Sequence, residues 1–227
     1  MRKGEVRKQA IIEASEQLFC QKGYLETTVD DVLQALGCSK GSFYHYFDSK
    51  LSVLTAICES KVQKNFDAYK KTRVLSTREK MNALLYHAQW FRPEEEDFVF
   101  LMLRLRAREE AAVMENVLRA AMRQTFKREL GDLLMILNET GAAHVSRIGL
   151  ENLVFEVFTA FYDEMCEAIL ECVRTGVSVA DPLAEVVASA RFLWERVLDM
   201  DYGSVEIVKL EEAIPMMERV ASRLRLV

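Results

Sequence analysis

The chain has 227 residues, of which 50% are hydrophobic and 29% are charged, and its formal net charge is -5. These proportions favour a soluble globular protein of one or two domains with an ample core. No apolar run approaches the ~20 residues that a membrane-spanning helix needs, and the basic N-terminal segment lacks the apolar stretch of a secretion signal. We therefore expect a cytoplasmic protein that does not enter a membrane.

The five cysteines form no Cys-x-x-Cys pair and are odd in number. In a reducing cytoplasm this pattern favours free thiols that serve as core residues, with a redox sensor as the alternative. The cysteines are Cys20, Cys38, Cys58, Cys166 and Cys172.

The charge is distributed unevenly along the chain. Residues 1–71 contain 11 Lys/Arg against 9 Asp/Glu, whereas residues 72–227 contain 19 against 26. Binding to nucleic acid depends on local basic clusters rather than on net charge. An acidic body with a basic N-terminal part is therefore compatible with DNA binding, but it disfavours non-specific coating of nucleic acid.

The hydrophobic periodicity is helical almost from the first residue. Thr28 with Asp31 approximates a capping box, Gly37 marks a turn, and Ser39 is suited to cap the next helix. The helices predicted in this part run over about 5–22, from Thr28 to the turn at Gly37, over about 40–46, and from 48–50 to about 71.

Helical periodicity continues to the C-terminus, so the predicted class is all-α. Ser76 and Glu79 form a second capping-box pattern, and Asp181-Pro182 fits an N-cap followed by the first helical residue. The helices predicted here are about 76–91, one opened by Pro93 and Glu94–Asp97 and closed by Arg104, Arg106 and Arg108, a long one ending at Glu139, then 149–175, 181–200, and 205–226 broken or kinked at Pro215.

The short helix after Gly37 has two chemically different faces. Phe43 and Phe47 are four residues apart and suited to pack inward, whereas Lys40, Tyr44 and His45 project outward. Gly41 allows close approach to a DNA backbone, and Ser42 adds a small polar group. Two short helices, the second with a polar outer face, are typical of a helix-turn-helix whose second helix enters the major groove.

The segment TTVDDVLQALGCSKGSFYHYFDSKLSVL, with the preceding LFCQKGY, resembles the DNA-binding domain of the TetR family of bacterial transcriptional regulators over about 55 residues. Two departures are Leu33 and Cys38, where the family usually has Ala and Val. The resemblance implies DNA contacts from Thr28, Ser39, Lys40, Ser42, Tyr44, His45 and Lys50. We expect Lys40, Ser42, Tyr44 or His45 to reach base edges, and Thr28, Ser39 and Lys50 to hold phosphates.

The resemblance also implies the domain plan: residues 1–50 form a three-helix DNA-binding domain, helix 50–71 connects, and residues 72–227 form a larger helical ligand-binding and dimerisation domain. The apolar residues of 149–175 span about 220° of arc, which favours a second partner beyond the domain's own core. A central helix buried in its own domain is the alternative. The dimer-interface candidates are Leu150, Val154, Val157, Phe161, Met165 and Ile169.

The expected function is a ligand-responsive repressor that binds a double-stranded DNA operator as a homodimer and is released by a small molecule. The effector-pocket candidates are His87, Trp90, Phe91, Met102, Arg104, Phe155, Phe158 and Tyr162, although residues of these types are more often ordinary core. An anionic effector could use Arg104 and Arg108, but their place near a helix C-terminus explains them without one.

No pattern in the sequence indicates catalysis. The three histidines are far apart, no residue set has metal-ligand spacing, and there is no nucleophile elbow, P-loop or dinucleotide fingerprint. We expect no metal, cofactor or enzymatic activity. Two alternatives remain: a helical small-molecule-binding or adaptor protein without DNA binding, and an all-α enzyme.

Overall fold

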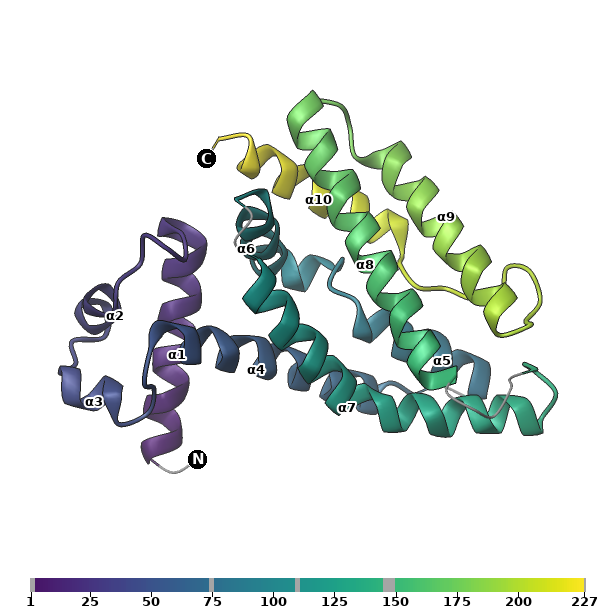
Figure 1. Ribbon diagram of the computed structural model, residues 1–227, viewed down its shortest axis with the longest axis horizontal. Helices are drawn as coiled ribbons and strands as arrows, with labels where there is room; N and C mark the ends of the chain where they lie inside the picture. The colour runs from purple at the N-terminus through teal and green to yellow at the C-terminus, as the bar shows by residue number, and fades with distance from the viewer. Residues whose placement is uncertain (1–2, 74–75, 109–110, 145–149, 227) are drawn as a thin grey trace. The chain divides into compact units, whose positions relative to one another are not determined.

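A computed structural model describes residues 3–73, 76–108, 111–144 and 150–226 (Figure 1). All regular secondary structure within these residues is helical, which confirms the predicted all-α class. The chain divides into two compact units: residues 1–61 with 100–121, and residues 62–99 with 122–227. These units are defined by contacts within the chain. They do not test the predicted division into a DNA-binding domain and a ligand-binding domain, which stays a prediction.

The first unit contains α1 (Lys3–Lys22), α2 (Val29–Leu36), α3 (Lys40–Tyr44) and the beginning of α4 (Lys50–Lys71). It also contains the end of α6 (Glu96–Ala107) and the beginning of α7 (Ala112–Glu139). Helix α2 packs against both α1 and α3. The core of the first unit contains side chains that are at most 4% exposed: Ile11, Phe19, Val32, Phe43, Phe47 and Ile57.

Local sequence signals set the ends of α2 and α3. The Thr28 side chain accepts a hydrogen bond from the Asp31 amide, and the Asp31 side chain accepts one from the Thr28 amide, which confirms the predicted capping box. Gly37 ends α2 in the left-handed region, with φ 58° and ψ 39°, where glycine avoids the steric cost of a side chain. Ser39 caps α3 by accepting from the Ser42 amide.

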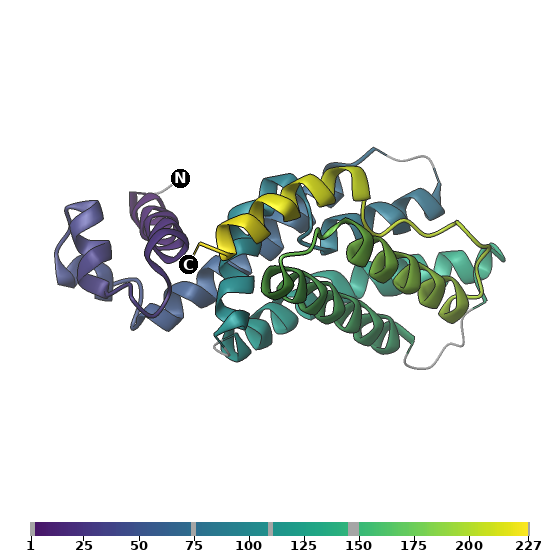
Figure 2. The ribbon, with the colours of Figure 1, turned by 90° about the horizontal axis from the view of Figure 1, so that it is seen from above.

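The second unit contains α5 (Thr77–Ala88), the short 3-10 helix η1 (Pro93–Glu95), α8 (Leu150–Thr175), α9 (Ala180–Val197) and α10 (Leu210–Leu224), together with parts of α4, α6 and α7. Helices α8 and α9 pack side by side, and α10 packs against both of them (Figures 1 and 2). Arg219 and Arg223 of α10 pair with Glu96 (2.7 Å) and Asp97 (2.8 Å) at the start of α6. The acidic first turn of α6 is therefore held by tertiary ion pairs.

Several predicted helix boundaries are wrong; among them, α9 (Ala180–Val197) ends at Val197 rather than near residue 200. Helix α5 ends at Ala88 rather than near residue 91, and α10 begins at Leu210 rather than near 205. Helix α9 begins at Ala180, which places Asp181 inside its first turn instead of at the N-cap. The carboxylate of Glu218 accepts the Val179 amide at 3.0 Å, so a distant residue satisfies this helix start.

Pro215 lies inside α10 and does not break it. An interior proline removes a backbone hydrogen bond and costs about 3 kcal/mol. The buried face of the helix outweighs this cost, because five of its side chains are buried in the second unit: Ala213, Met216, Met217, Val220 and Ala221. Tertiary packing therefore overrides the local signal.

Candidate DNA-binding site

Helix α3 presents two distinct faces, as its sequence predicts. Phe43 is 1% exposed and Phe47 is 4% exposed, and their ring centroids lie 6.0 Å apart. On the other side, Lys40 and His45 are exposed and Tyr44 is 52% exposed. The buried rings fix the helix to its unit, and the three polar side chains remain accessible to a ligand.

The polar residues of α3 are oriented by neighbouring helices. The Lys40 ammonium lies 3.2 Å from the Asp30 carboxylate of α2, and both side chains are about 70% exposed. An exposed pair of this kind is weak, so Lys40 can exchange Asp30 for a phosphate or a base edge. The Arg7 Nε donates to the half-buried Ser42 hydroxyl at 3.5 Å. Arg7 was missed as a site residue by the sequence reasoning, although the basic N-terminal cluster contains it.

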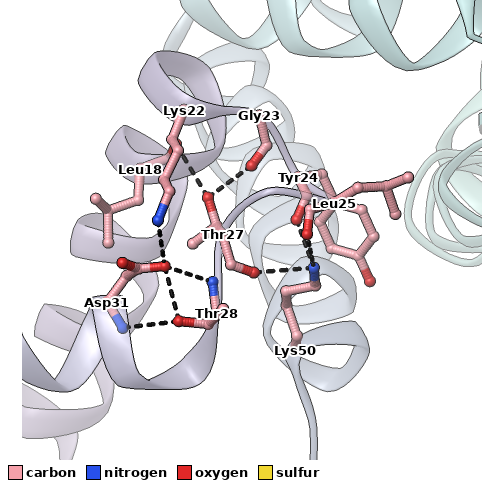
Figure 3. Close-up of polar contacts among 9 residues, drawn as sticks. All are labelled: Leu18, Lys22, Gly23, Tyr24, Leu25, Thr27, Thr28, Asp31 and Lys50. Atoms are coloured by element: carbon pink, nitrogen blue, oxygen red, sulfur yellow. Dashed lines mark hydrogen bonds and ion pairs between the residues drawn. The ribbon is translucent and has the colours of Figure 1, made fainter.

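Thr28 is held at the start of α2 by a polar network (Figure 3). Its amide and hydroxyl both donate to the Asp31 carboxylate at 2.7 Å, and the Lys22 ammonium of α1 donates to the same oxygen at 2.7 Å. The hydrogen bond from Lys22 and those from Thr28 hold the pKa of Asp31 well below its ordinary value. Thr28 itself is exposed, so the network positions a residue that remains accessible.

The side chain of Lys50, which was predicted to hold a DNA phosphate, binds backbone carbonyl groups of its own unit. Its ammonium donates to the carbonyl oxygens of Tyr24, Leu25 and Thr27 in the turn between α1 and α2 (Figure 3). The side chain is half-buried. In this structure Lys50 therefore stabilises the turn between α1 and α2, and its predicted contact with DNA stays a prediction.

The arginines at the end of α6 contact the end of α1 and the turn that follows it. The buried Arg104 guanidinium donates to the carbonyl oxygens of Cys20 and Lys22, both at 3.4 Å, and Arg108 pairs with Glu26. Positive charge is favourable at a helix C-terminus, where carbonyl groups lack partners. These contacts account for Arg104 and Arg108 without an anionic effector.

The other effector candidates divide between the two units. Met102 is buried in the first unit with Arg104, whereas the remaining six belong to the second unit. There Phe91 stacks on Tyr162, with centroids 6.1 Å apart and rings inclined by 26°. Phe161 contacts Phe91 and Phe158 edge-on at 6.1 and 6.4 Å. These rings join the segment after α5 to helix α8.

The remaining candidates of the second unit are placed as follows. Trp90 and Phe155 are buried. The His87 Nδ1 contacts the Arg92 guanidinium at 2.9 Å, and its Nε2 contacts the Thr72 hydroxyl at 3.2 Å. Burial, with the Arg92 charge, lowers the pKa of His87. A neutral imidazole that accepts from Arg92 and donates to Thr72 satisfies both contacts.

The predicted dimer-interface residues of α8 lie mostly inside the second unit. Val154, Phe161, Met165 and Ile169 are at most 4% exposed, and Val157 is half-buried; the side chain of Leu150 lies outside the described residues. Three large apolar side chains on α8 and α9 are instead about half exposed: Leu153 (48%), Phe192 (49%) and Leu193 (52%). None of these three is among the predicted interface residues.

Within the described residues, no helix is long and apolar enough to cross a membrane. Residues 11–57, which include α2, α3 and the beginning of α4, match the sequence family described as bacterial regulatory proteins, tetR family. Among relatives, the HTH-type transcriptional repressor KstR2 of Rhodococcus jostii is 34% identical over 65 residues, 29% of this chain and 32% of the relative. The biofilm operon negative regulator IcaR of Staphylococcus aureus is 44% identical over 46 residues, 20% of this chain and 25% of the relative. The chain thus matches no more than about a third of the length of either relative.

The fold of the longer part of the chain also has counterparts among solved structures. A TetR-family transcriptional regulator from Pectobacterium atrosepticum superposes with a TM-score of 0.60 and 19% identity over 87% of this chain and 97% of that chain. The fatty acid degradation regulator FadR from Bacillus halodurans superposes with a TM-score of 0.58 and 18% identity, over 82% of this chain and 94% of that chain. At these identities the likeness concerns the fold, while the N-terminal match concerns the sequence as well. Residues 11–57 therefore match the TetR family in sequence, and the chain shares its helical fold with solved regulators of that family.

Proposed function

We propose that this protein is a transcriptional repressor that binds a pseudo-palindromic operator as a homodimer and is released by a small-molecule effector. The single observation that carries the proposal is the arrangement of α3, with Phe43 and Phe47 buried and Lys40, Tyr44 and His45 exposed. A helix anchored by one face and polar on the other is suited to enter the major groove of DNA. KstR2 and IcaR, which share the N-terminal domain, are named as a repressor and a negative regulator.

The contacts divide by chemistry. Tyr44 and His45 have flat polar rings that can bond base edges, whereas exposed hydroxyls and ammonium groups suit phosphate oxygens. We assign base reading to Tyr44 and His45, and phosphate contact to Thr28, Ser39 and Lys40. Arg7 supports this surface through its contact with Ser42, although the guanidinium itself could turn toward a phosphate.

A homodimer follows from the limited size of the DNA-reading element. Helix α3 has only five residues, so one copy offers few base contacts. Two copies on half-sites about 34–36 Å apart, or a multiple of that spacing, would double them. The half-exposed side chains of Leu153, Phe192 and Leu193 lie on α8 and α9, which pack against each other, and they support an interface formed by these two helices, because exposed apolar surface commonly marks protein contacts.

For the effector we propose a site beside the aromatic cluster of Phe91, Phe158 and Tyr162 in the second unit. Aromatic side chains with a few polar groups are typical linings of small-molecule sites. An effector that binds better to the DNA-free state lowers operator affinity by its differential affinity for the two states. The alternative, a small-molecule-binding or adaptor protein without DNA binding, retains this site and gives no role to α3.

A gel-shift titration tests the proposal. The purified protein is mixed with the DNA upstream of its own coding region and with shuffled DNA of the same composition, at several salt concentrations. We expect preferential binding to the native DNA, with affinity that falls as salt rises because phosphate contacts release counterions. Equal affinity for both DNAs at every salt concentration favours the adaptor alternative. A thermal-shift screen with the same protein then searches for the effector, since a ligand of the native state raises the melting temperature.

A further inference from the structure

Arg92, which lies between α5 and η1 in the second unit, has a buried guanidinium group with part of its hydrogen-bonding capacity unused. The side chain is 1% exposed. Its Nη1 lies 2.9 Å from the Nδ1 of His87 and 3.4 Å from the Glu94 carboxylate. By contrast, no group of the described residues accepts a hydrogen bond from Nε or Nη2. Buried polar groups of native proteins nearly always have a hydrogen-bond partner, so these two nitrogens need an explanation.

The two nitrogens without an acceptor share one edge of the guanidinium. The N–H of Nε and one N–H of Nη2 point in the same direction and form a planar fork. The contact of Nη1 with His87, and the Tyr86 ring centre 5.5 Å from the guanidinium carbon, hold the plane of the group in place. A carbonyl oxygen with two lone pairs, or a carboxylate with two oxygens, can accept from both N–H groups. A single acceptor group of a small molecule would therefore satisfy the fork.

The charge of Arg92 is already balanced, although its hydrogen bonds are incomplete. The Glu95 carboxylate, also 1% exposed, lies 3.7 Å from Nη2, which is close enough for an ion pair and too long for a hydrogen bond. Glu94, which is 53% exposed, adds a second negative charge. Arg92 also acts on the Glu212 carboxylate, which is paired with Lys209 at 3.5 Å. These five side chains carry three negative charges against two positive ones, so Arg92 lacks an acceptor rather than an anion.

This balance separates two classes of ligand. A carboxylate would bring a further negative charge into a buried site, where an uncompensated charge is strongly unfavourable. An uncharged carbonyl oxygen would accept from the fork and leave the pair of Arg92 with Glu95 intact. Two other buried donors of the second unit have no acceptor among the described residues: the amide nitrogen of Asn65 on α4 and the indole nitrogen of Trp194 on α9. Unused donors favour a molecule that brings acceptors.

We propose that Arg92 recognises the effector through a carbonyl oxygen, and that the effector is an uncharged aromatic or apolar ketone, ester or amide. The proposal rests on the effector binding proposed above and names its chemical class. The apolar body follows from the aromatic side chains of the same unit, among them Phe91, which precedes Arg92 in the chain, and Tyr162, on which Phe91 stacks. Arg92 is not among the effector candidates predicted from the sequence, because its burial depends on residues that are distant in the chain.

Three probes of nearly the same shape distinguish the classes: acetophenone has a carbonyl, benzoate has a carboxylate, and ethylbenzene has no acceptor. Their naphthalene counterparts, 2-acetonaphthone, 2-naphthoate and 2-ethylnaphthalene, test a larger body. NMR titration of the purified full-length protein, without DNA, measures the affinity for each probe. A hydrogen bond to a charged group is worth roughly 10- to 150-fold in affinity. In at least one series, the ketone should therefore bind about tenfold or more tightly than both of its analogues.

Substitutions of the buried pair test the role of Arg92. Arg92→Met combined with Glu95→Gln removes both charges, so that neither is left buried alone, and it should abolish the preference for the ketone. Glu95→Gln alone leaves the charge of Arg92 unbalanced, so the carboxylate should bind about tenfold or more tightly than it binds to wild type. Lys209→Met is the control, because Lys209 is a half-exposed cation 4.9 Å from the Tyr86 ring centre, and it should change the ketone affinity by less than about twofold.

Circular dichroism checks that each variant is folded, and if the double variant is not, Glu95→Gln decides. The proposal is overturned if wild type prefers the carboxylates, if it binds ketones and ethyl compounds equally, or if the double variant keeps the ketone preference. Unchanged carboxylate affinity in Glu95→Gln overturns it too, and so does the absence of binding by all six probes, which would indicate that solvent alone satisfies the fork. These measurements need no DNA. Ketone binding through Arg92 in a protein that selects no DNA sequence would therefore support this proposal and defeat the proposed repressor function.

Discussion

Two adjacent residues of α3 should separate folding from DNA reading. Phe43 is 1% exposed and packs against Phe47, whereas Tyr44 is 52% exposed. Removing a fully buried phenylalanine ring costs about 3–5 kcal/mol, through lost burial and the cavity that remains. Domains of this size are stable by only about 5–15 kcal/mol in total. Phe43→Ala should therefore remove a large share of the stability of the first unit.

Tyr44→Ala should have the opposite profile. Its ring meets that of Phe43 edge-on, at 5.4 Å and 80°, and such a contact is worth at most about 1.5 kcal/mol. Loss of a contact to a base edge should cost about 1–3 kcal/mol of binding in each subunit, or roughly 5- to 150-fold for each half-site of the operator. Tyr44→Ala thus remains folded and binds its operator weakly.

Urea unfolding followed by two signals tests both variants. Circular dichroism reports all helices, whereas the tryptophans, Trp90 and Trp194, both lie in the second unit. Phe43→Ala should lower the circular dichroism midpoint more than the fluorescence midpoint, and Tyr44→Ala should change neither by much. The assignment of opposite faces fails if the two variants lose equal stability, or if Tyr44→Ala binds the operator as well as wild type.

Three further predictions address the rest of the chain. Gly37→Ala should cost about 1–2 kcal/mol, because φ is 58° and nothing lies within 4 Å of the added carbon. Gly23→Ala should cost more, because its φ of 107° lies beyond the left-handed region and because the Glu26 side chain, which the added carbon would meet, has to shift while it is paired with Arg108. Urea midpoints that reverse this order would contradict the reasoning. Burial lowers the pKa of His87 in the folded protein, so around and below pH 6.5 the unfolded chain binds more protons than the folded one, and stability should fall as the pH drops from 6.5 through the folded-state pKa. His87→Asn should therefore make the melting temperature depend less on pH between pH 7.5 and 5. An unchanged pH profile would exclude His87 as the cause. Phe192→Asp should shift the sedimentation coefficient of the proposed dimer toward that of the monomer. Met135→Asp is the control, because Met135 (55% exposed) and Phe192 (49% exposed) are similarly accessible, and it should leave the dimer intact. Equal sedimentation of both variants would argue against an interface at α9.

Features governed by neighbouring residues were predictable from the sequence. The capping boxes of Thr28 and Ser76 each involve residues three positions apart, and the left-handed turn at Gly37 depends on a single residue. Phe43 and Phe47 alternate with exposed side chains at helical spacing, so the inward face of α3 could also be predicted. The sequence therefore predicts the ends of single helices and the two faces of α3.

Features governed by distant residues were not predictable. Lys50 meets carbonyls 23 to 26 positions away, and Arg104 meets the end of α1 more than 80 positions away. From sequence spacing alone, a basic residue near a helix end is equally consistent with a ligand contact. The wide apolar arc of α8 had the same ambiguity, and the burial of Met165 and Ile169 shows that much of the arc serves its own unit.

The shortness of α3 explains why distant contacts matter for DNA reading. An isolated helix of fewer than about 12 residues is marginal in water, and α3 has five. Its conformation must therefore be imposed by the buried Phe43, the Ser39 cap, and the packing of α2 against it. Because α2 itself begins at the turn that Lys50 holds, the polar contacts of this turn should influence the orientation of α3. In the proposed operator complex, substitutions that displace this turn should consequently lower affinity even when the side chains that face the bases are unchanged.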